Sequence, residues 1–197
     1  DRALLSSRAF DEIATEALMH IKQLVSCARA SVTMFDFERG TSTFLATSFN
    51  NGNNAGVGNT ISLEEYGQHI IEELKQNKPS FIDDILTDPR STELDKQLAE
   101  LGFRTWLYLP LVHQGQLIGS LNLARGAAQP FTREDADIAY DIANELAIAI
   151  RQARLTDALQ VELGERKQVE ADLRQREAIL EAVTFAGEEF IKTPNWQ

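Results

Sequence analysis

The residues best suited to chemistry in this sequence are its three histidines and its single cysteine. His20 lies in a predicted helix and His113 at a predicted turn, and we expect both to be surface or packing residues. His69 lies in a second predicted helix, where it could face a ligand or bind haem iron, which takes a proximal histidine. One isolated histidine is weak support for haem, so we expect ordinary packing or solvation for His69 and no haem.

Cys27, the only cysteine, cannot form an internal disulfide or complete a cysteine-ligated zinc site. It precedes the first predicted strand, where a small buried hydrophobic side chain is the usual role of cysteine. We therefore expect no metal site. The cysteine usage indicates a reducing, cytoplasmic location.

Two acidic pairs, Glu64-Glu65 and Asp83-Asp84, could in principle supply acid and base catalysis. Neighbouring side chains in a strand point to opposite faces, so such a pair does not converge on one substrate. Solvated charges or helix caps are the expected roles, and no serine has an obvious histidine and acid partner. The sequence predicts no catalytic residues, and this chain is not expected to be an enzyme.

The stretch "NNGNNAGVGNT" at residues 50–60 is rich in glycine and asparagine. Its "GVGNTI" is not a G-x-G-x-x-G fingerprint, does not pass directly from strand to helix, and is followed by no lysine that could meet phosphates. A phosphate cradle is therefore not expected. Two roles of this stretch remain open: a mobile lid over a ligand, and a loop that only connects two elements.

Composition excludes two classes of partner. The formal charge is −11, from 19 Lys and Arg against 30 Asp and Glu. Nucleic acids and anionic membranes both attract a basic face, which this chain lacks. No apolar run approaches the ~20 residues that a membrane span needs. We expect no nucleic-acid partner and no membrane contact.

Hydrophobic periodicity predicts the order helix, hairpin, helix, extended segment, helix, hairpin and long helix. These elements are expected at residues 7–26, 30–49, 66–77, 80–85, 91–102, 105–125 and from about 133. The order lacks the strand–helix–strand alternation of parallel sheets. It indicates an α+β fold (an α/β sandwich) in which helices cover both faces of an antiparallel sheet.

The second predicted hairpin, "TWLYLPLVHQGQLIGSLNLAR", turns at Gln114-Gly115, where glycine supplies a positive φ. A two-residue turn pairs Val112 with Leu117 and Leu111 with Ile118. Proline cannot donate to the ladder, so Pro110 is expected at a bulge or with its nitrogen turned off the sheet.

From Leu155 onward the apolar residues follow a heptad pattern, with steps of four and three residues. The predicted seam contains Leu155, Leu159, Val169, Leu173, Leu180 and Val183, interrupted by Glu162, Arg166 and Arg176. The pattern favours a coiled-coil connector over residues 155–183, forming a parallel homodimer that passes conformational signals. The alternative is a solvated helix without a partner.

The ordered set of elements resembles a GAF domain, a sensory module common in bacterial signalling proteins. The resemblance covers residues 8–154 and rests on five stretches: "RASVTMFD", "GVGNTISLEEYG", "PSFIDDI", "GFRTWLYLPLVHQGQLIGSLNLAR" and "FTREDADIAYDIANELAIAIRQARL". It implies a sensory domain over residues 1–154 with a six-stranded antiparallel sheet. The first and last helices would pack on one face, and a small-molecule pocket would lie on the other.

The rest of the chain also resembles parts of signalling proteins. "ERKQVEADLRQREAILEAV" is similar to a connector helix that precedes another sensory module, and residues 184–197 resemble the start of a further GAF or PAS domain. The resemblance implies a multidomain sensor whose output is a histidine kinase or a cyclic-di-nucleotide enzyme.

Position in the family fold implies a ligand pocket formed by Tyr66, His69, Ile70, Phe81, Trp106, Tyr108 and Asn122. Bilin-binding relatives attach their pigment through a Cys-His pair, and this chain has Glu93-Leu94 at that place, so no covalent bilin is expected there. The signature of the cyclic-nucleotide-binding relatives is absent. The ligand stays unknown.

Two functions follow from the resemblance. In the first, a small molecule in the pocket changes the positions of the flanking helices and thereby shifts the dimeric linker between two conformational states. In the second, the domain is a structural dimerisation relay whose pocket is filled by its own side chains. The second requires Phe81, Trp106 and Tyr108 to close on one another.

Overall fold

The computed structural model describes residues 2–49, 56–126 and 129–192, with side chains from residue 13 to residue 184 within those ranges. The chain divides into two compact units, Asp1–Ala153 and Arg154–Gln197. Helix α5 (Arg133–Lys192) begins in the first unit and supplies the helical part of the second. Its start agrees with the predicted start near residue 133, where Asp135 caps the helix through the backbone N–H and hydroxyl of Thr132.

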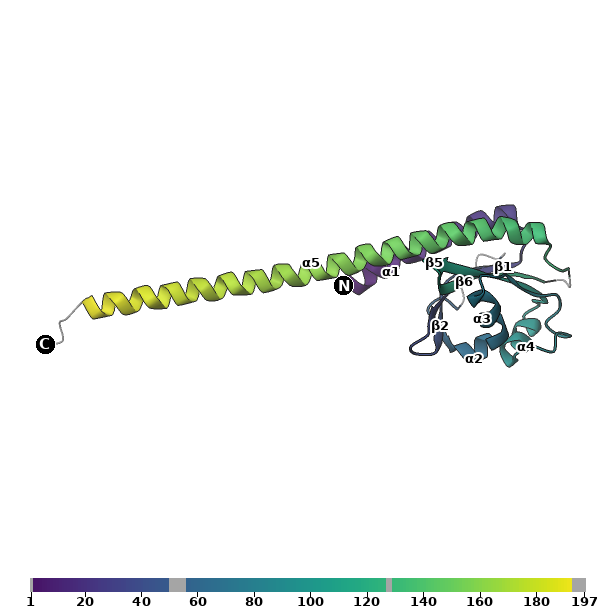
Figure 1. Ribbon diagram of the computed structural model, residues 1–197, viewed down its shortest axis with the longest axis horizontal. Helices are drawn as coiled ribbons and strands as arrows, with labels where there is room; N and C mark the ends of the chain where they lie inside the picture. The colour runs from purple at the N-terminus through teal and green to yellow at the C-terminus, as the bar shows by residue number, and fades with distance from the viewer. Residues whose placement is uncertain (1, 50–55, 127–128, 193–197) are drawn as a thin grey trace. The chain divides into compact units, whose positions relative to one another are not determined.

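The first unit is built on a six-stranded sheet in the order β3-β2-β1-β6-β5-β4 (Figure 1). The strands are β1 (Arg29–Asp36), β2 (Thr41–Phe49), β3 (Thr60–Ser62), β4 (Ser80–Ile82), β5 (Thr105–His113) and β6 (Gln116–Arg125). Every neighbouring pair is antiparallel. The predicted antiparallel α+β fold is confirmed, and both predicted hairpins are present.

Helices cover both faces of this sheet, as predicted (Figure 1). On one face lie α1 (Arg2–Leu24) and the first part of α5, whose apolar side chains pack against Ala30, Val32, Leu107, Leu109, Leu121 and Leu123. On the other lie α2 (Leu63–Tyr66), α3 (Gln68–Lys75) and α4 (Glu93–Glu100). Strand alternation sends Arg29, Ser31, Thr33 and Phe35 of β1 toward this second face.

The helix predicted over residues 66–77 is present as α3, and a separate short helix that was not predicted, α2, precedes it, with Gly67 between the two. Ser62 and Glu65 form a capping box that starts α2, and Gly67 has a φ of 109°. A Cβ at Gly67 would also lie 3.2 Å from Ile70 Cδ1. Only glycine meets both conditions without strain, and the break sets the direction of α2 independently of α3.

The second hairpin turns at Gln114 and Gly115, both with positive φ, and Val112 pairs with Leu117 as predicted. The predicted pairing of Leu111 with Ile118 is wrong, because a bulge leaves Ile118 without a partner and Leu111 pairs with Gly119. Pro110 lies one residue before this irregularity, opposite Ser120.

Candidate functional site

A small cavity of about 20 Å³ lies on the sheet face that carries α2, α3 and α4. Its walls come from α2, α4 and the strands β1, β2, β5 and β6, because alternate residues of each strand point to this face. The lining residues are Arg29, Phe44, Tyr66, Leu94, Asp95, Leu98, Trp106, Tyr108 and Asn122. A volume of this size holds about one water molecule.

One side of the cavity is a buried hydrogen-bond network that joins α2 to the sheet. The Tyr66 hydroxyl donates to Asn122 Oδ1 at 2.8 Å, and its oxygen lies 2.6 Å from Ser120 Oγ. The amide of Asn122 in turn donates to Thr33 Oγ1 at 2.9 Å. A phenol donates only one hydrogen, so Ser120 is the donor to Tyr66 and the network satisfies itself. Burial raises the pKa of the Tyr66 hydroxyl, which stays protonated.

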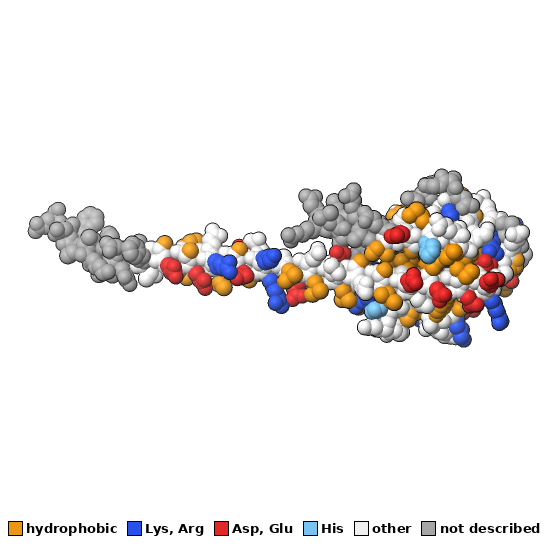
Figure 2. Space-filling view, turned by 90° about the horizontal axis from the view of Figure 1, so that it is seen from above, with side chains coloured by type: hydrophobic (Ala, Val, Ile, Leu, Met, Phe, Trp, Pro, Cys, Tyr) orange, Lys and Arg blue, Asp and Glu red, His pale blue; other side chains and the backbone are white. Residues whose placement is uncertain are grey.

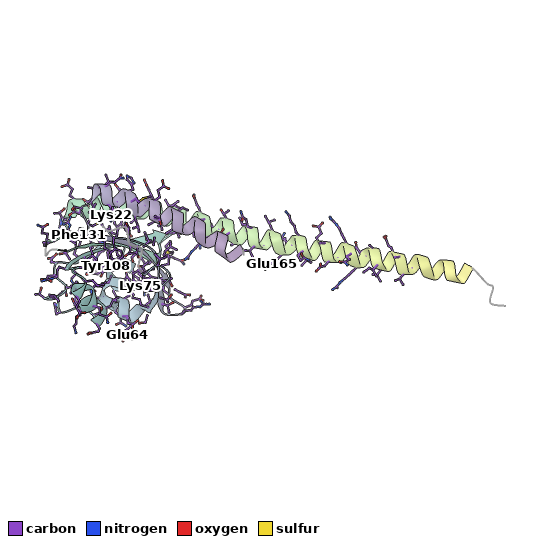
Figure 3. The ribbon with its side chains drawn as sticks, turned by 180° about the vertical axis from the view of Figure 1, so that it is seen from behind. Lys22, Glu64, Lys75, Tyr108, Phe131 and Glu165 are labelled. Atoms are coloured by element: carbon purple, nitrogen blue, oxygen red, sulfur yellow. The ribbon has the colours of Figure 1, made fainter. Side chains whose placement is uncertain are left out.

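Aromatic rings form another part of the wall. Trp106 and Tyr108 stack with ring centroids 5.7 Å apart and an interplanar angle of 16°. Phe103 meets Trp106 edge-on at 6.0 Å, and Tyr66 meets Tyr108 edge-on at 5.9 Å. Figure 3 shows Tyr108 on the side of the sheet that faces α2, which carries Glu64, and away from Lys22 of α1. Burial raises the pKa of the Tyr108 hydroxyl well above its ordinary value.

Arg29 is the cation of the site. It is 7% exposed, and no group of the described residues accepts a hydrogen bond from its Nε. The guanidinium carbon lies 5.6, 5.5 and 5.3 Å from the ring centroids of Phe44, Phe49 and Trp106. Burial lowers the pKa of this guanidinium, because a low-dielectric environment disfavours the charged form. The rings compensate for part of that cost through cation–π attraction.

Asp95 brings a buried carboxylate to the cavity from the first turn of α4. It is 3% exposed, and its Oδ2 accepts from the backbone N–H of Thr92 at 2.7 Å and from the Thr92 hydroxyl at 2.9 Å. These bonds form the capping box that starts α4. The cap therefore holds both the start of the helix and a negative charge at the edge of the cavity.

The structure brings four of the seven predicted pocket residues together, namely Tyr66, Trp106, Tyr108 and Asn122. Ile70 is fully buried in the same apolar cluster but does not line the cavity. The placement of Phe81 in the pocket is wrong. Phe81 pairs with Leu107 and packs with it on the α1 and α5 side of the sheet, because cross-strand neighbours share a face.

His69 also lies away from the cavity. It lines an open depression on the surface together with Glu64, Gly67, Gln68, Glu72, Arg90 and Thr92. Burial lowers the pKa of His69, and the positive charge of Arg90 lowers it further. Within the ranges that the structure describes, no three His, Cys, Asp or Glu side chains are grouped to hold a metal ion.

Arg29 and Asp95 are the two charged lining residues that the sequence analysis missed. A signal for Arg29 exists in β1, where Arg29, Ser31 and Thr33 alternate with Ala30, Val32 and Met34. Such alternation usually marks a solvated face, and here the polar face is buried beneath α2 and the aromatic rings. Asp95 has the sequence pattern of an ordinary capping residue.

The described part of the glycine-rich stretch lies against β2, where Gly58 donates its backbone N–H to Phe44 O at 2.8 Å. The alternatives of a ligand lid and a plain connection concern residues 50–60, and residues 50–55 of that stretch lie outside the described residues.

The predicted coiled-coil seam belongs to the second unit. Its six apolar residues are 49–67% exposed in the single chain: Leu155, Leu159, Val169, Leu173, Leu180 and Val183. Ion pairs at i,i+4 spacing, Glu162–Arg166 and Glu170–Arg174, support the helix. Residues 185–192 continue α5, and the predicted start of a further domain at residues 184–197 lies largely outside the described side chains.

The helical face of the first unit also exposes apolar side chains, which Figure 2 shows from above. Met19 and Leu24 of α1 and Ile148 of α5 are at least half exposed. Ile148 stands seven residues before Leu155, which is the heptad spacing. Among the described residues, no helix combines the length and the apolar character that crossing a bilayer requires.

Comparison with known proteins identifies the fold. The family model of the GAF domain matches residues 9–150. No curated protein sequence gives a significant match. Among solved structures, the PixJ GAF domain from Thermosynechococcus elongatus superposes with a TM-score of 0.66 at 20% identity, covering 81% of this chain and 95% of that one.

Two further structures are similar. A domain of a putative two-component sensor histidine kinase from Sinorhizobium meliloti has a TM-score of 0.59 and 24% identity, covering 76% of this chain and 95% of that one. A GAF domain/HD domain protein from Geobacter sulfurreducens has a TM-score of 0.63 and 18% identity, covering 74% of this chain and 94% of that one. The family match spans well over half of the chain, and the fold agrees with it throughout the first unit. This chain belongs to the GAF domain family and is a non-catalytic sensory module of signalling proteins.

Proposed function

We propose that this GAF domain binds a small molecule in the cavity between the sheet, α2 and α4, and relays its state through a parallel homodimer of α5 to a downstream output such as a histidine kinase. The relay acts in the cytoplasm, in keeping with a single unpaired cysteine. The output enzyme belongs to a longer protein of which this chain is the sensory part.

One observation carries the binding proposal. A pocket filled only by its own side chains would satisfy its buried polar groups, as most protein interiors do. Within the part of the chain that the structure describes, Arg29 Nε and Trp106 Nε1 are both buried without an acceptor, and both residues line the cavity. A bound molecule that accepts from them removes that cost.

The structural relay remains the second candidate, because the cavity is small and the rings of Trp106 and Tyr108 already stack. Phe81 takes no part in that closure, since it packs on the other face of the sheet. A filled core formed by Phe103, Trp106 and Tyr108 is the version of the relay that the geometry supports.

Native mass spectrometry of the freshly purified chain, preceded by its visible spectrum, separates the two candidates. A dimer that carries an additional small-molecule mass supports the sensor. A bare dimer supports the structural relay. A bare monomer contradicts the homodimer part of the proposal.

A further inference from the structure

Arg29 is a buried cation that forms no salt bridge with any described residue. Among the described residues no carboxylate oxygen lies within 4 Å of its guanidinium, although the side chain is only 7% exposed. Two half-buried arginines of the first unit, Arg104 and Arg125, are paired with Asp84 and Asp135. Buried charges in proteins are normally paired and hydrogen-bonded, so Arg29 is an exception that calls for a partner.

A second donor stands beside it. Trp106 is 2% exposed, and its Nε1–H has no acceptor among the residues with described side chains. The guanidinium carbon of Arg29 lies 5.3 Å from the centroid of the Trp106 ring, so both donors belong to one region of the cavity. The nearby amide oxygen of Asn122 is already engaged by Tyr66. Two buried donors without a hydrogen-bond partner match a ligand that brings acceptors of its own.

The charges around the cavity restrict the kind of acceptor. A guanidinium presents its donors in a planar fork that fits the two oxygens of a carboxylate. Asp95 places a fixed negative charge on the same cavity. That charge opposes a dianion, such as a phosphate monoester, more strongly than a monoanion.

The remaining walls suit an apolar body. Phe44, Leu94, Leu98 and the stacked pair of Trp106 and Tyr108 provide apolar surface around the charged groups. Leu94, Asp95 and Leu98 all come from the eight-residue helix α4. Displacement of this one helix therefore enlarges the cavity beyond the single water molecule that its present volume admits.

We propose that the cavity selects a small organic monocarboxylate, with the carboxylate on Arg29 and the Nε1–H of Trp106 and the body of the molecule among the rings. This inference rests on the proposed function and specifies its ligand class. Binding pairs Arg29 with the carboxylate of the ligand and moves α4. The displacement of this helix, which carries Asp95, is then the conformational change that signals the bound ligand.

The test compares isosteric probes that differ in charge. Acetate is paired with acetamide and benzoate with benzamide, and inorganic phosphate represents the other class of anion. Binding to the 197-residue chain is measured by calorimetry and by the indole N–H resonance of Trp106, which Trp106→Phe assigns. We expect the carboxylates to bind at millimolar concentration or tighter and to move that resonance, and the amides to do neither.

Variants locate the site. Arg29→Met keeps an unbranched side chain, shorter than that of arginine, and removes the charge, and it should weaken carboxylate binding about tenfold or more. Arg39→Met removes an arginine that is 83% exposed outside the cavity, and it should leave binding unchanged. Trp106→Phe should weaken binding less than Arg29→Met. The comparison of carboxylates with amides needs no variant, so it decides the question even if Arg29→Met fails to fold.

Several results overturn the inference. Equal binding of amides and carboxylates, full binding by a folded Arg29→Met protein, preference for phosphate, or no response to either carboxylate would each do so. A neutral molecule that copurifies in native mass spectrometry would overturn the monocarboxylate class while leaving the sensor function intact. No probe binding and no copurified mass would remove both.

Discussion

The hydroxyl of Tyr66 in α2 donates to the amide oxygen of Asn122 in β6 at 2.8 Å, across 56 positions of the chain. Both residues are buried, and the bond is part of a network that includes Ser120 and Thr33. It fastens a helix of four residues, too short to be stable alone, to the centre of the sheet. The cavity keeps its α2 wall because of this contact.

Tyr66→Phe should therefore destabilise the domain without leaving a large cavity. It deprives Asn122 Oδ1 and Ser120 of a partner in a buried environment, which should cost about 1–3 kcal/mol of unfolding free energy. Urea denaturation measures the loss. Tyr140→Phe is the matched control, because its hydroxyl donates to Asn77 O at 3.3 Å in an exposed position, and it should cost less than about 0.5 kcal/mol. Equal effects of the two substitutions would contradict a structural role for the network.

Gly119→Ala should be strongly destabilising, because β1 and β6 approach closely at this residue. A Cβ at Gly119 would lie 2.2 Å from the backbone oxygen of Thr33 and 3.2 Å from Met34 Cα. Backbone atoms cannot step aside as a flexible side chain can, so we expect a loss of about 3 kcal/mol in unfolding free energy. Gly115→Ala provides the comparison. It meets nothing within 4 Å and bears only the strain of a positive φ, about 1 kcal/mol. A smaller loss of unfolding free energy for Gly119→Ala than for Gly115→Ala would show that β1 and β6 can move apart at Gly119.

The homodimer proposal predicts that charges on the seam weaken self-association and charges elsewhere on α5 do not. Leu159→Lys and Leu173→Lys put a cation at seam positions, where two copies would face each other. Val161→Lys makes the same change two positions from Leu159, at a residue that is 53% exposed but lies off the seam. Sedimentation equilibrium should show weaker dimers for the first two variants only.

The same seam contains Arg166, and its replacement tests the prediction in the opposite direction. Arg166→Leu removes a cation from an otherwise apolar position, and the dimer should become tighter. If Arg166→Leu, Leu159→Lys and Val161→Lys all leave the association constant unchanged, α5 does not pair through this face.

The pKa of Asp84 should lie below its ordinary value because Arg104 holds the carboxylate with two hydrogen bonds, at 2.8 and 2.5 Å, and the backbone N–H of Leu86 adds a third. A carboxyl whose pKa is lowered by folding stabilises the native state above its unfolded pKa, near 3.9, and that contribution disappears as the pH falls through the folded pKa. Arg104→Met should raise the pKa of Asp84 toward the ordinary value, as followed by the NMR titration of its carboxyl carbon. Arg104→Met should also reduce the fall of the melting temperature as the pH drops below about 4. An unchanged titration would show that Arg104 does not hold this carboxylate in solution.

Much of the architecture is encoded in short-range patterns. The turn at Gln114-Gly115, the cap at Thr92, the start of α5 at Arg133 and the alternation of β1 are each written within a few neighbouring residues, and each is present in the structure. Such signals are local because backbone φ, capping and side-chain periodicity depend on nearby residues. The order of these elements was sufficient to predict an antiparallel sheet with helices on both faces and to indicate the GAF family.

The sequence by itself thus determined most of the elements and their order, although not the short elements β3 and α2. Only the tertiary structure decided which residues meet. The bulge at Ile118, the face of Phe81 and the burial of Arg29 among three rings depend on register and on contacts between distant segments. A shift of one residue in a strand reverses its faces, and no local signal reports whether a polar face will meet water or a layer of helices. For that reason the charged residues that characterise this cavity emerged only from the packed fold.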